Sequence, residues 1–306
     1  MENKNVLITG GSGLVGQRLS EILIEKGYSV SHLSRKEDLT GPIKKYRWDP
    51  ESGLFDTNCL KNIDHIIHLA GAGVADKRWT ESRKKEILAS RIDSTKLLLA
   101  NLEKTNNNVK SVVSASAIGY YGFSENEKLF TEKDNAGTDF LATVTKAWEN
   151  ETGKFSAIGI RTVRLRIGVV LSEKGGALPQ MVNPIKYFAG MAIGSGQQII
   201  SWIALDDLCN LFIYSIENES IKGIYNAVAP NPISNNEFTK MIGKVLKRPI
   251  WPINLPEFLL EILLGEMANI VTKGSAVSNH RIANETDFRY KFTSLEPCLK
   301  ALYNIS

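Results

Sequence analysis

The sequence contains few of the residues that build disulfides and metal sites. Of its 306 residues, three are cysteine and four are histidine. Cys59, Cys209 and Cys298 lie far apart and are odd in number, so they favour neither a disulfide framework nor a metal cluster. Because the histidines show no ligand spacing, we expect no metal site. Free cysteines suit a reducing compartment, so we expect a cytoplasmic protein.

The sequence also lacks an excess of charge of one sign and a long apolar run. Its 37 basic and 33 acidic residues leave a formal net charge of +4, which argues against nucleic acid or an anionic membrane as a partner. The most apolar late stretch, residues 258–271, is too short for a membrane span and contains Glu261 and Glu266. The first expected strand begins at residue 5, so we expect no secretory leader.

Strand-like and helix-like stretches alternate through the first half of the chain. This pattern predicts a doubly wound parallel α/β sheet of the Rossmann type. We expect strands over residues 5–9, 28–34, 64–70, 110–116 and 160–172, and helices over residues 17–27 and 82–104.

After residue 172 the sequence becomes rich in glycine and then largely helical, which predicts a smaller, largely helical substrate region. Residues 223–229 are apolar and could return to the sheet. We expect an NAD(P)-binding domain over residues 1–230, with residues 175–197 contributing to the substrate region, and a smaller C-terminal domain over residues 231–306.

A glycine-rich turn separates the first expected strand from the first expected helix. Gly10 allows a tight turn, Gly13 lets the backbone approach a pyrophosphate, and Gly16 allows close packing of helix on strand. The helix N-terminus adds unpaired N–H groups and a positive dipole end. A turn without a ligand is the alternative, but the flanking strand and helix favour a nucleotide site. It comprises Gly10, Gly11, Ser12, Gly13, Leu14, Val15 and Gly16.

The end of the second expected strand bears on the choice of cofactor. NAD-binding folds usually carry an acidic residue here, but this chain has Ser34 and Arg35, which can pair with a 2′-phosphate. Lys36 can assist, whereas Glu37 and Asp38 lie close by. A solvated surface arginine is the alternative reading. The pattern favours NADP(H) over NAD(H).

Several segments resemble the extended short-chain dehydrogenases/reductases of the nucleotide-sugar epimerase type, and the resemblance spans almost the whole chain. Three of them are TGGSGLVG at residues 9–16, HLAGAG at 68–73 and SASAIGYYG at 114–122. Four further segments narrow the resemblance to the YfcH-like branch, whose members are described as epimerase-family or NAD(P)-dependent oxidoreductases of unknown substrate. These segments are LSRK, KKEILASR, FLATVTKAWE and GSGQQIISWIALDDL. The resemblance implies cofactor contacts from Ser34, Arg35, Leu69, Ala70, Gly71, Glu86, Arg91, Val169 and Val170.

Three polar residues in or next to these segments could also have purely structural roles. Glu86 and Arg91 lie five residues apart on a helix, so they do not share one face well and could simply be two surface charges. His68 lies within an apolar run and fits a buried histidine with satisfied hydrogen bonds better than a catalyst.

The catalytic pattern of the resembled family is incomplete in this chain. Members normally carry a tyrosine and, four residues later, a lysine that lowers the pKa of the tyrosine, because an unperturbed phenol is a poor base at neutral pH. Aligning Glu149 with the glutamate that follows the motif puts Leu141 and Thr145 in those two positions. Lys146 lies one residue after the position of the family lysine, so it fits a solvated surface lysine better than a catalytic one.

Other residues could still serve catalysis. Ser116 matches the family serine and is the candidate catalytic residue, and Tyr120 and Tyr121 could reach the nicotinamide. A core strand that runs into a turn is the alternative for all three. Ala204 stands where the branch usually has a histidine, and Asp206 fits a cap or brace of the following helix better than a proton donor.

Two functions therefore fit the sequence. The first is an NADP(H)-binding oxidoreductase of the epimerase family that acts on a small hydroxyl or carbonyl substrate, which could be linked to a nucleotide. The second is a non-catalytic NADP(H)-binding sensor or partner-binding protein that has lost the tyrosine and lysine. The sequence leaves the substrate, the direction of reaction and a homodimer open.

Overall fold

The computed structural model describes residues 4–123 and 128–305 and contains an eight-stranded central sheet. The strand order is β12-β8-β6-β5-β1-β2-β3-β4, and every pairing is parallel except that of β3 with β4. The strands are β1 (Asn5–Thr9), β2 (Ser29–Ser34), β3 (Lys44–Asp49), β4 (Leu54–Phe55), β5 (His65–His68), β6 (Ser111–Ala117), β8 (Arg161–Ile167) and β12 (Gly223–Ala227). The expected α/β class is confirmed.

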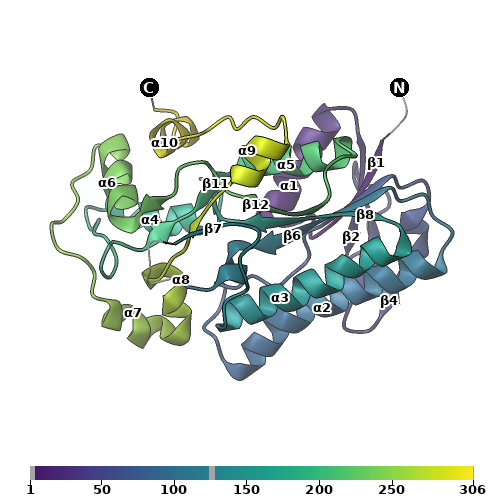
Figure 1. The fold of residues 1–306 in the computed structure, drawn as a ribbon, viewed down its shortest axis with the longest axis horizontal. Coiled ribbons are helices and arrows are strands. Elements are labelled where there is room, and N and C mark those ends of the chain that lie inside the picture. The colour runs from purple at the N-terminus through teal and green to yellow at the C-terminus, as the bar shows by residue number, and fades with distance from the viewer. Residues whose placement is uncertain (1–3, 124–127, 306) are drawn as a thin grey trace.

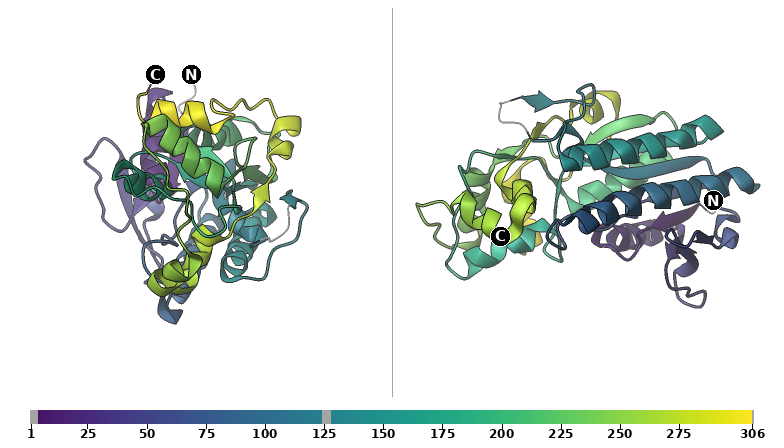
Figure 2. Two further views of the ribbon diagram at one scale, coloured as in Figure 1. Left: turned by 90° about the vertical axis from the view of Figure 1, so that its left-hand side faces the viewer. Right: turned by 90° about the horizontal axis from the view of Figure 1, so that it is seen from below.

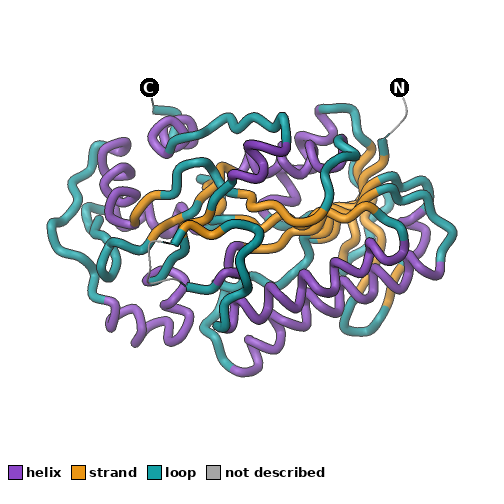
Figure 3. The backbone as a smooth tube through the Cα atoms, viewed as in Figure 1, coloured by secondary structure: helices purple, strands orange, loops and turns teal. Residues whose placement is uncertain are grey.

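Helices cover both faces of this sheet and complete three layers (Figures 1 and 3). In Figure 1, α1 (Leu14–Glu25) and α5 (Leu205–Glu217) lie above the sheet, and α2 (Glu81–Lys104) and α3 (Phe140–Gly153) lie below it. Figure 2 shows α2 and α3 running side by side. Strand β1 shows why the layers form: Val6 and Ile8 join the core under α1 and α5, while Leu7 joins the opposite core.

Most of the remaining helices and short strands lie at the left of Figure 1, whereas α9 lies above the central sheet. The remaining helices are α4 (Ala177–Lys186), α6 (Asn235–Leu246), α7 (Glu257–Leu264), α8 (Asn269–Thr272), α9 (His280–Glu285) and α10 (Leu295–Leu302). The short strands are β7 (Leu129–Phe130), β9 (Val169–Leu171), β10 (Ile199–Ile200), β11 (Trp202–Ala204), β13 (Ile233–Ser234) and β14 (Ala276–Val277). The 3₁₀ turns are η1 (Thr57–Leu60), η2 (Ile118–Tyr121), η3 (Lys154–Ile158) and η4 (Gly265–Ala268). None of the described helices is long and apolar enough to cross a membrane.

The structure corrects the expected elements in three places. Strands β3 and β4 extend the sheet beyond β2, where the sequence analysis placed none. The single strand expected over residues 160–172 breaks at Gly168 into β8, which pairs with β12, and β9, which pairs with β11. The backbone of Ser201 approaches Gly168 so closely that a Cβ there would collide with its carbonyl oxygen. Helix α1 begins at Leu14, three residues earlier than expected, and ends before Gly27 at φ +82°.

Candidate functional site

The glycine-rich turn joins the end of β1 to α1 and leaves no room for a side chain at Gly10, Gly11 or Gly16. Gly10 has φ +70°, and a Cβ on it would lie 2.9 Å from the carbonyl carbon of Leu69. A Cβ on Gly16 would collide with the carbonyl oxygen of Gly10. Gly11 packs in the same way against the ring of His32. The turn therefore depends on glycine at three positions and lies directly against the segment that follows β5.

The outer side of the same turn faces solvent. Ser12 and Gly13 are exposed, and the Gly13 N–H donates to the carbonyl oxygen of Gly10 at 3.1 Å. Gly13 is the N-cap of α1, and no described side chain hydrogen-bonds to the first-turn amides. An N-terminus of this kind suits an anion such as a phosphate group.

Thr9 ties β1 to the end of β5. Its hydroxyl oxygen accepts hydrogen bonds from the N–H groups of Leu69 (3.0 Å) and Ala70 (3.1 Å), and it lies 2.8 Å from Nδ1 of His68. The other ring nitrogen of His68 lies 3.0 Å from the hydroxyl of Thr95. The expectation of a buried, satisfied histidine is confirmed; burial lowers the pKa of His68 to about 4, so the ring is neutral. The sequence analysis missed Thr9.

Ser34 and Arg35 lie beside the glycine turn because β1 and β2 end in register. Thr9 pairs with Leu33, so the residue after each strand emerges at the same edge of the sheet. The guanidinium of Arg35 is exposed and pairs with no described residue, while the Ser34 hydroxyl accepts from the Lys36 N–H at 3.2 Å. The structure thus provides an unengaged cation here.

The side chains of Arg91 and Glu86 have different partners: Arg91 contacts the loop after β5, and Glu86 pairs with Arg83 on its own helix. An Nη atom of Arg91 donates to the carbonyl oxygen of Ala72 at 3.0 Å, and its guanidinium lies over the ring of Trp148 at 5.1 Å. Arg91 thus supports the loop that follows β5 at Ala72 and also packs against Gly71. Glu86 is exposed and pairs instead with Arg83 at 2.7 Å.

Val169 and Val170 belong to β9, which pairs with β11. A Cβ on Gly176 would lie 3.5 Å from the side chain of Leu14 and 3.8 Å from the carbonyl oxygen of Val170. Leu14, Val15 and Val170 pack against the same core. The structure therefore brings β9 and the loop after it to the start of α1.

Ser116 belongs to a buried polar cluster. Its hydroxyl donates to Oε1 of Glu149 at 2.6 Å, and Nε and one Nη atom of Arg166 donate to the two carboxylate oxygens at 2.8 Å each. Ser116, Glu149 and Arg166 are at most 4% exposed. Burial disfavours the charge on Arg166, but the hydrogen bonds and charge attraction of Glu149 and Tyr121 together outweigh that cost and raise the pKa of Arg166. This ion pair holds Ser116 as a hydrogen-bond donor to α3.

The two tyrosines after Ser116 have different environments. The hydroxyl of Tyr121 is buried, donates to Oδ1 of Asn226 at 2.6 Å and accepts from Arg166 at 3.0 Å. Burial raises its pKa to about 12. Tyr120 is half-buried, and the centroid of its ring lies 3.4 Å from Cζ of Arg166. Its hydroxyl makes no hydrogen bond to any described residue.

Asp206 braces two helices. It lies in the first turn of α5 and pairs with Arg18 of α1 at 2.7 Å. The N-cap of α5 is Ala204, so bracing is confirmed and capping is wrong. Asp207 is buried and accepts the N–H groups of Lys291 (2.7 Å) and Phe292 (3.0 Å), which attach the chain before α10 to α5.

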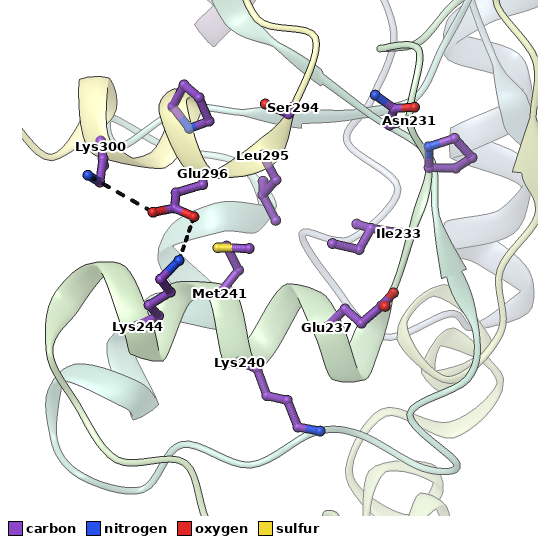
Figure 4. A pocket seen from close by; sticks show the side chains of 12 residues that line it. Asn231, Ile233, Glu237, Lys240, Met241, Lys244, Ser294, Leu295, Glu296 and Lys300 are labelled. Carbon is purple, nitrogen blue, oxygen red and sulfur yellow. Dashed lines mark hydrogen bonds and ion pairs between the residues drawn. The ribbon is translucent and has the colours of Figure 1, made fainter.

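A cavity of about 950 Å³ lies between α6 and α10 (Figure 4). Glu296 in its wall pairs with Lys244 at 2.7 Å and with Lys300 at 4.0 Å. None of the residues expected to bind cofactor lines this cavity. Among the residues that the structure describes, no group of three or more His, Cys, Asp or Glu side chains could hold a metal ion.

Comparison with known proteins identifies the family. The model of the NAD dependent epimerase/dehydratase family matches residues 6–227, and that of a domain of unknown function, DUF1731, matches residues 255–302. The chain belongs to the NAD-dependent epimerase/dehydratase family. It is 40% identical over 301 residues to the epimerase family protein YfhF of Bacillus subtilis, covering 97% of each chain. It is 37% identical to the chloroplastic SDR39U1 homolog of Arabidopsis thaliana, covering 97% of this chain and 86% of the relative.

Two solved structures, of an epimerase family protein and of an epimerase, match almost the whole of this chain. The human epimerase family protein SDR39U1, crystallised with NADPH, has a TM-score of 0.88 and 30% identity, with 98% of this chain and 99% of that chain covered. A nucleoside-diphosphate sugar epimerase from Corynebacterium glutamicum has a TM-score of 0.79 and 31% identity, with 98% of this chain and 58% of that chain covered. The extended short-chain dehydrogenase/reductase fold is thereby established.

Within this family the present chain departs from the Tyr-x-x-x-Lys pattern on α3. Leu141 has no titratable group, and the hydroxyl of Thr145 donates to the carbonyl oxygen of Leu141 at 2.7 Å. A Cβ on Gly119 of η2 would lie 3.3 Å from Leu141 and 3.8 Å from Thr145, so η2 packs on these two positions. Lys146 is exposed, in agreement with its reading as a solvated lysine. Neither Leu141 nor Thr145 carries a phenol or an ammonium group.

Proposed function

We propose that this chain is an NADPH-dependent oxidoreductase of the epimerase family that acts on the carbonyl or hydroxyl group of a small substrate. The observation that carries the proposal is the meeting of the glycine turn, residues 69–71 and Arg35 at the carboxyl edge of β1, β2 and β5. This edge, where the strand order reverses, is where such sheets bind nucleotides. The human relative crystallised with NADPH supports the choice of cofactor.

The residues present fit this cofactor. The uncapped N-terminus of α1 suits the pyrophosphate, and the unengaged guanidinium of Arg35 with the Ser34 hydroxyl suits a 2′-phosphate. When bound, the reduced nicotinamide supplies a hydride. The name of the Corynebacterium glutamicum relative supports a nucleotide-linked substrate.

Replacing Arg35 by glutamate is expected to weaken NADPH binding about 10- to 100-fold, because a charge-assisted hydrogen bond contributes about 1.5–3 kcal/mol and glutamate repels the phosphate. Binding of NADH, which has no 2′-phosphate, should change little. The dissociation constants are measured by the fluorescence of the reduced nicotinamide, with Lys61→Glu as the control at an exposed lysine before β5. An equal loss for both cofactors would remove the 2′-phosphate role of Arg35.

Replacing Gly10 by alanine is expected to lower both stability and NADPH affinity. Alanine at φ +70° is strained, and its Cβ would press on the Leu69 carbonyl group. The matched control is Gly27→Ala, because Gly27 has φ +82° but nothing within 4 Å of its Cβ position. Gly27→Ala should lower the free energy of unfolding by about 1 kcal/mol and leave NADPH affinity unchanged. Equal effects of the two substitutions would contradict the close approach of Gly10 to Leu69. Urea unfolding measures the stability and NADPH titration measures the affinity.

The absence of a usable tyrosine and lysine on α3 favours a second candidate, a non-catalytic NADPH-binding sensor. An enzyme should oxidise NADPH in the presence of some member of a panel of aldehydes, ketones and nucleotide-linked keto sugars. A sensor should bind NADPH, oxidise none of it and change its affinity for a partner. Absorbance of the reduced nicotinamide distinguishes the two.

We also propose that residues 231–306, with residues 175–197, form the substrate-binding part of the molecule. Support comes from one apolar core in which Leu178 and Val182 of α4 pack with Phe238 of α6 and Leu299 of α10. A cytoplasmic location is supported by Cys59, Cys209 and Cys298, which are all unpaired and buried.

A further inference from the structure

Leu141 and Thr145 leave helix α3 without the tyrosine that donates a proton in the resembled family. The hydroxyl of Ser116 cannot fill that role while it donates its hydrogen to Glu149 at 2.6 Å. A hydroxyl carries one hydrogen and two acceptor lone pairs. Towards a ligand, Ser116 is therefore an acceptor, which suits the hydroxyl of an alcohol. Reduction of a carbonyl needs a proton from another group.

Turn η2 lies where the family tyrosine and lysine would act. It follows β6 directly after Ala117, and its Gly119 packs on Leu141 and Thr145. The next two residues, Tyr120 and Tyr121, are therefore the phenols that the fold brings to this position. Both rings lie near the guanidinium of Arg166. The distance from Cζ of Arg166 to the ring centroid is 3.4 Å for Tyr120 and 5.0 Å for Tyr121.

Of the two phenols, one is already engaged. The hydroxyl of Tyr121 is held between Asn226 and Arg166 in the core, and its ring is 3% exposed. The ring of Tyr120 is half-buried and its hydroxyl has no hydrogen-bond partner among the described residues. Of these two phenols, only that of Tyr120 has a proton that no described residue accepts, so it can be donated to a ligand.

We propose that Tyr120 is the proton donor of this enzyme and replaces the missing tyrosine of α3. The proposal rests on the proposed NADPH-dependent function. As the carbonyl carbon of the substrate receives a hydride from the reduced nicotinamide, the carbonyl oxygen takes the proton of the Tyr120 hydroxyl. The products are an alcohol, the oxidised nicotinamide and a phenolate, which regains its proton from water.

Arg166 positions this phenol. Its guanidinium lies against the face of the Tyr120 ring, a favourable cation–π arrangement, and is itself fixed by two hydrogen bonds to Glu149. The same ion pair fixes Ser116, which lies opposite Arg166 in the β6–β8 register. The donor phenol and the acceptor hydroxyl are therefore held by one rigid cluster.

The first test is turnover. Tyr120→Phe should lower kcat about 10²- to 10⁴-fold, the usual contribution of general acid catalysis, with the dissociation constant of NADPH unchanged. The control is Tyr46→Phe, because Tyr46 is also half-buried but lies on β3, on the other side of β1. Retention of wild-type kcat by Tyr120→Phe would overturn the proposal and leave the NADPH-dependent function intact.

The second test needs no turnover. With 3-fluorotyrosine in place of tyrosine, the fluorine resonances of residues 120 and 46 are assigned by their loss in Tyr120→Phe and Tyr46→Phe. Saturation with NADPH should shift the resonance of residue 120. The resonance of residue 46 is the comparison beside the proposed 2′-phosphate site, because Tyr46 pairs with Leu33 in the β2–β3 register. NADPH binding with an unmoved resonance at 120 overturns the role of Tyr120 alone. Absence of NADPH binding, or binding without reduction of any panel carbonyl, overturns the proposed function and the inference together.

Discussion

Arg166→Met is expected to lower the free energy of unfolding by about 3–5 kcal/mol, because it leaves the Glu149 carboxylate buried without its cation. Glu149 is 4% exposed and takes two hydrogen bonds of 2.8 Å from Arg166. The variant also removes a donor to the hydroxyl of Tyr121. Urea unfolding followed by circular dichroism measures the loss.

The double variant Arg166→Met/Glu149→Leu tests whether this loss comes from an unpaired charge. Removing both partners should cost less than the sum of the two single changes by about 1–3 kcal/mol. The control is Lys244→Met, which breaks a more exposed ion pair with Glu296 and should cost less than about 1 kcal/mol. Simple additivity of the two single changes would show that the pair is not energetically coupled.

Acidification is expected to destabilise the protein between about pH 6.5 and about pH 4 through three buried histidines. Burial lowers the pKa of His32, His65 and His68 from 6.5 to about 4 in the folded state. In this window the unfolded chain binds more protons than the folded chain, so stability falls as the pH falls. Each ring contributes on the order of 1 kcal/mol per pH unit.

Urea unfolding at several pH values between about 7 and about 5 measures this slope. His68→Gln should make it shallower, because the substitution removes one of the three titrating rings. His280→Gln is the control at an exposed histidine and should leave the slope unchanged. An unfolding free energy that does not change with pH in this range would contradict neutral buried rings.

The cofactor side of the fold was predictable because local patterns specify it. Consecutive apolar residues mark β1, β5 and β6, and the positions of Gly10 and Gly16 are dictated by close contacts of the backbone. Strand β3 was missed because only Tyr46 and Trp48 in the sequence KKYRWD face the core. Its side chains resemble those of a surface segment.

The catalytic side was less predictable because it depends on pairs of residues that are distant in the sequence. Arg166 and Glu149 are 17 residues apart on a strand and a helix, and no short motif links them. Their pairing engages the Ser116 hydroxyl, which the sequence presents as a free catalytic group. The sequence names Tyr120 and Tyr121 together, and only the packing of η2 separates an engaged phenol from a free one.

The buried cysteines give the protein a practical property for spectroscopy. Burial raises the pKa of Cys298 to about 12 and also raises the pKa values of Cys59 and Cys209, so the reactive thiolate form is scarce at neutral pH. A maleimide dye should therefore react slowly with the folded wild-type chain. One cysteine introduced at an exposed position, such as Lys61, could then carry a single fluorophore without removal of the three native thiols.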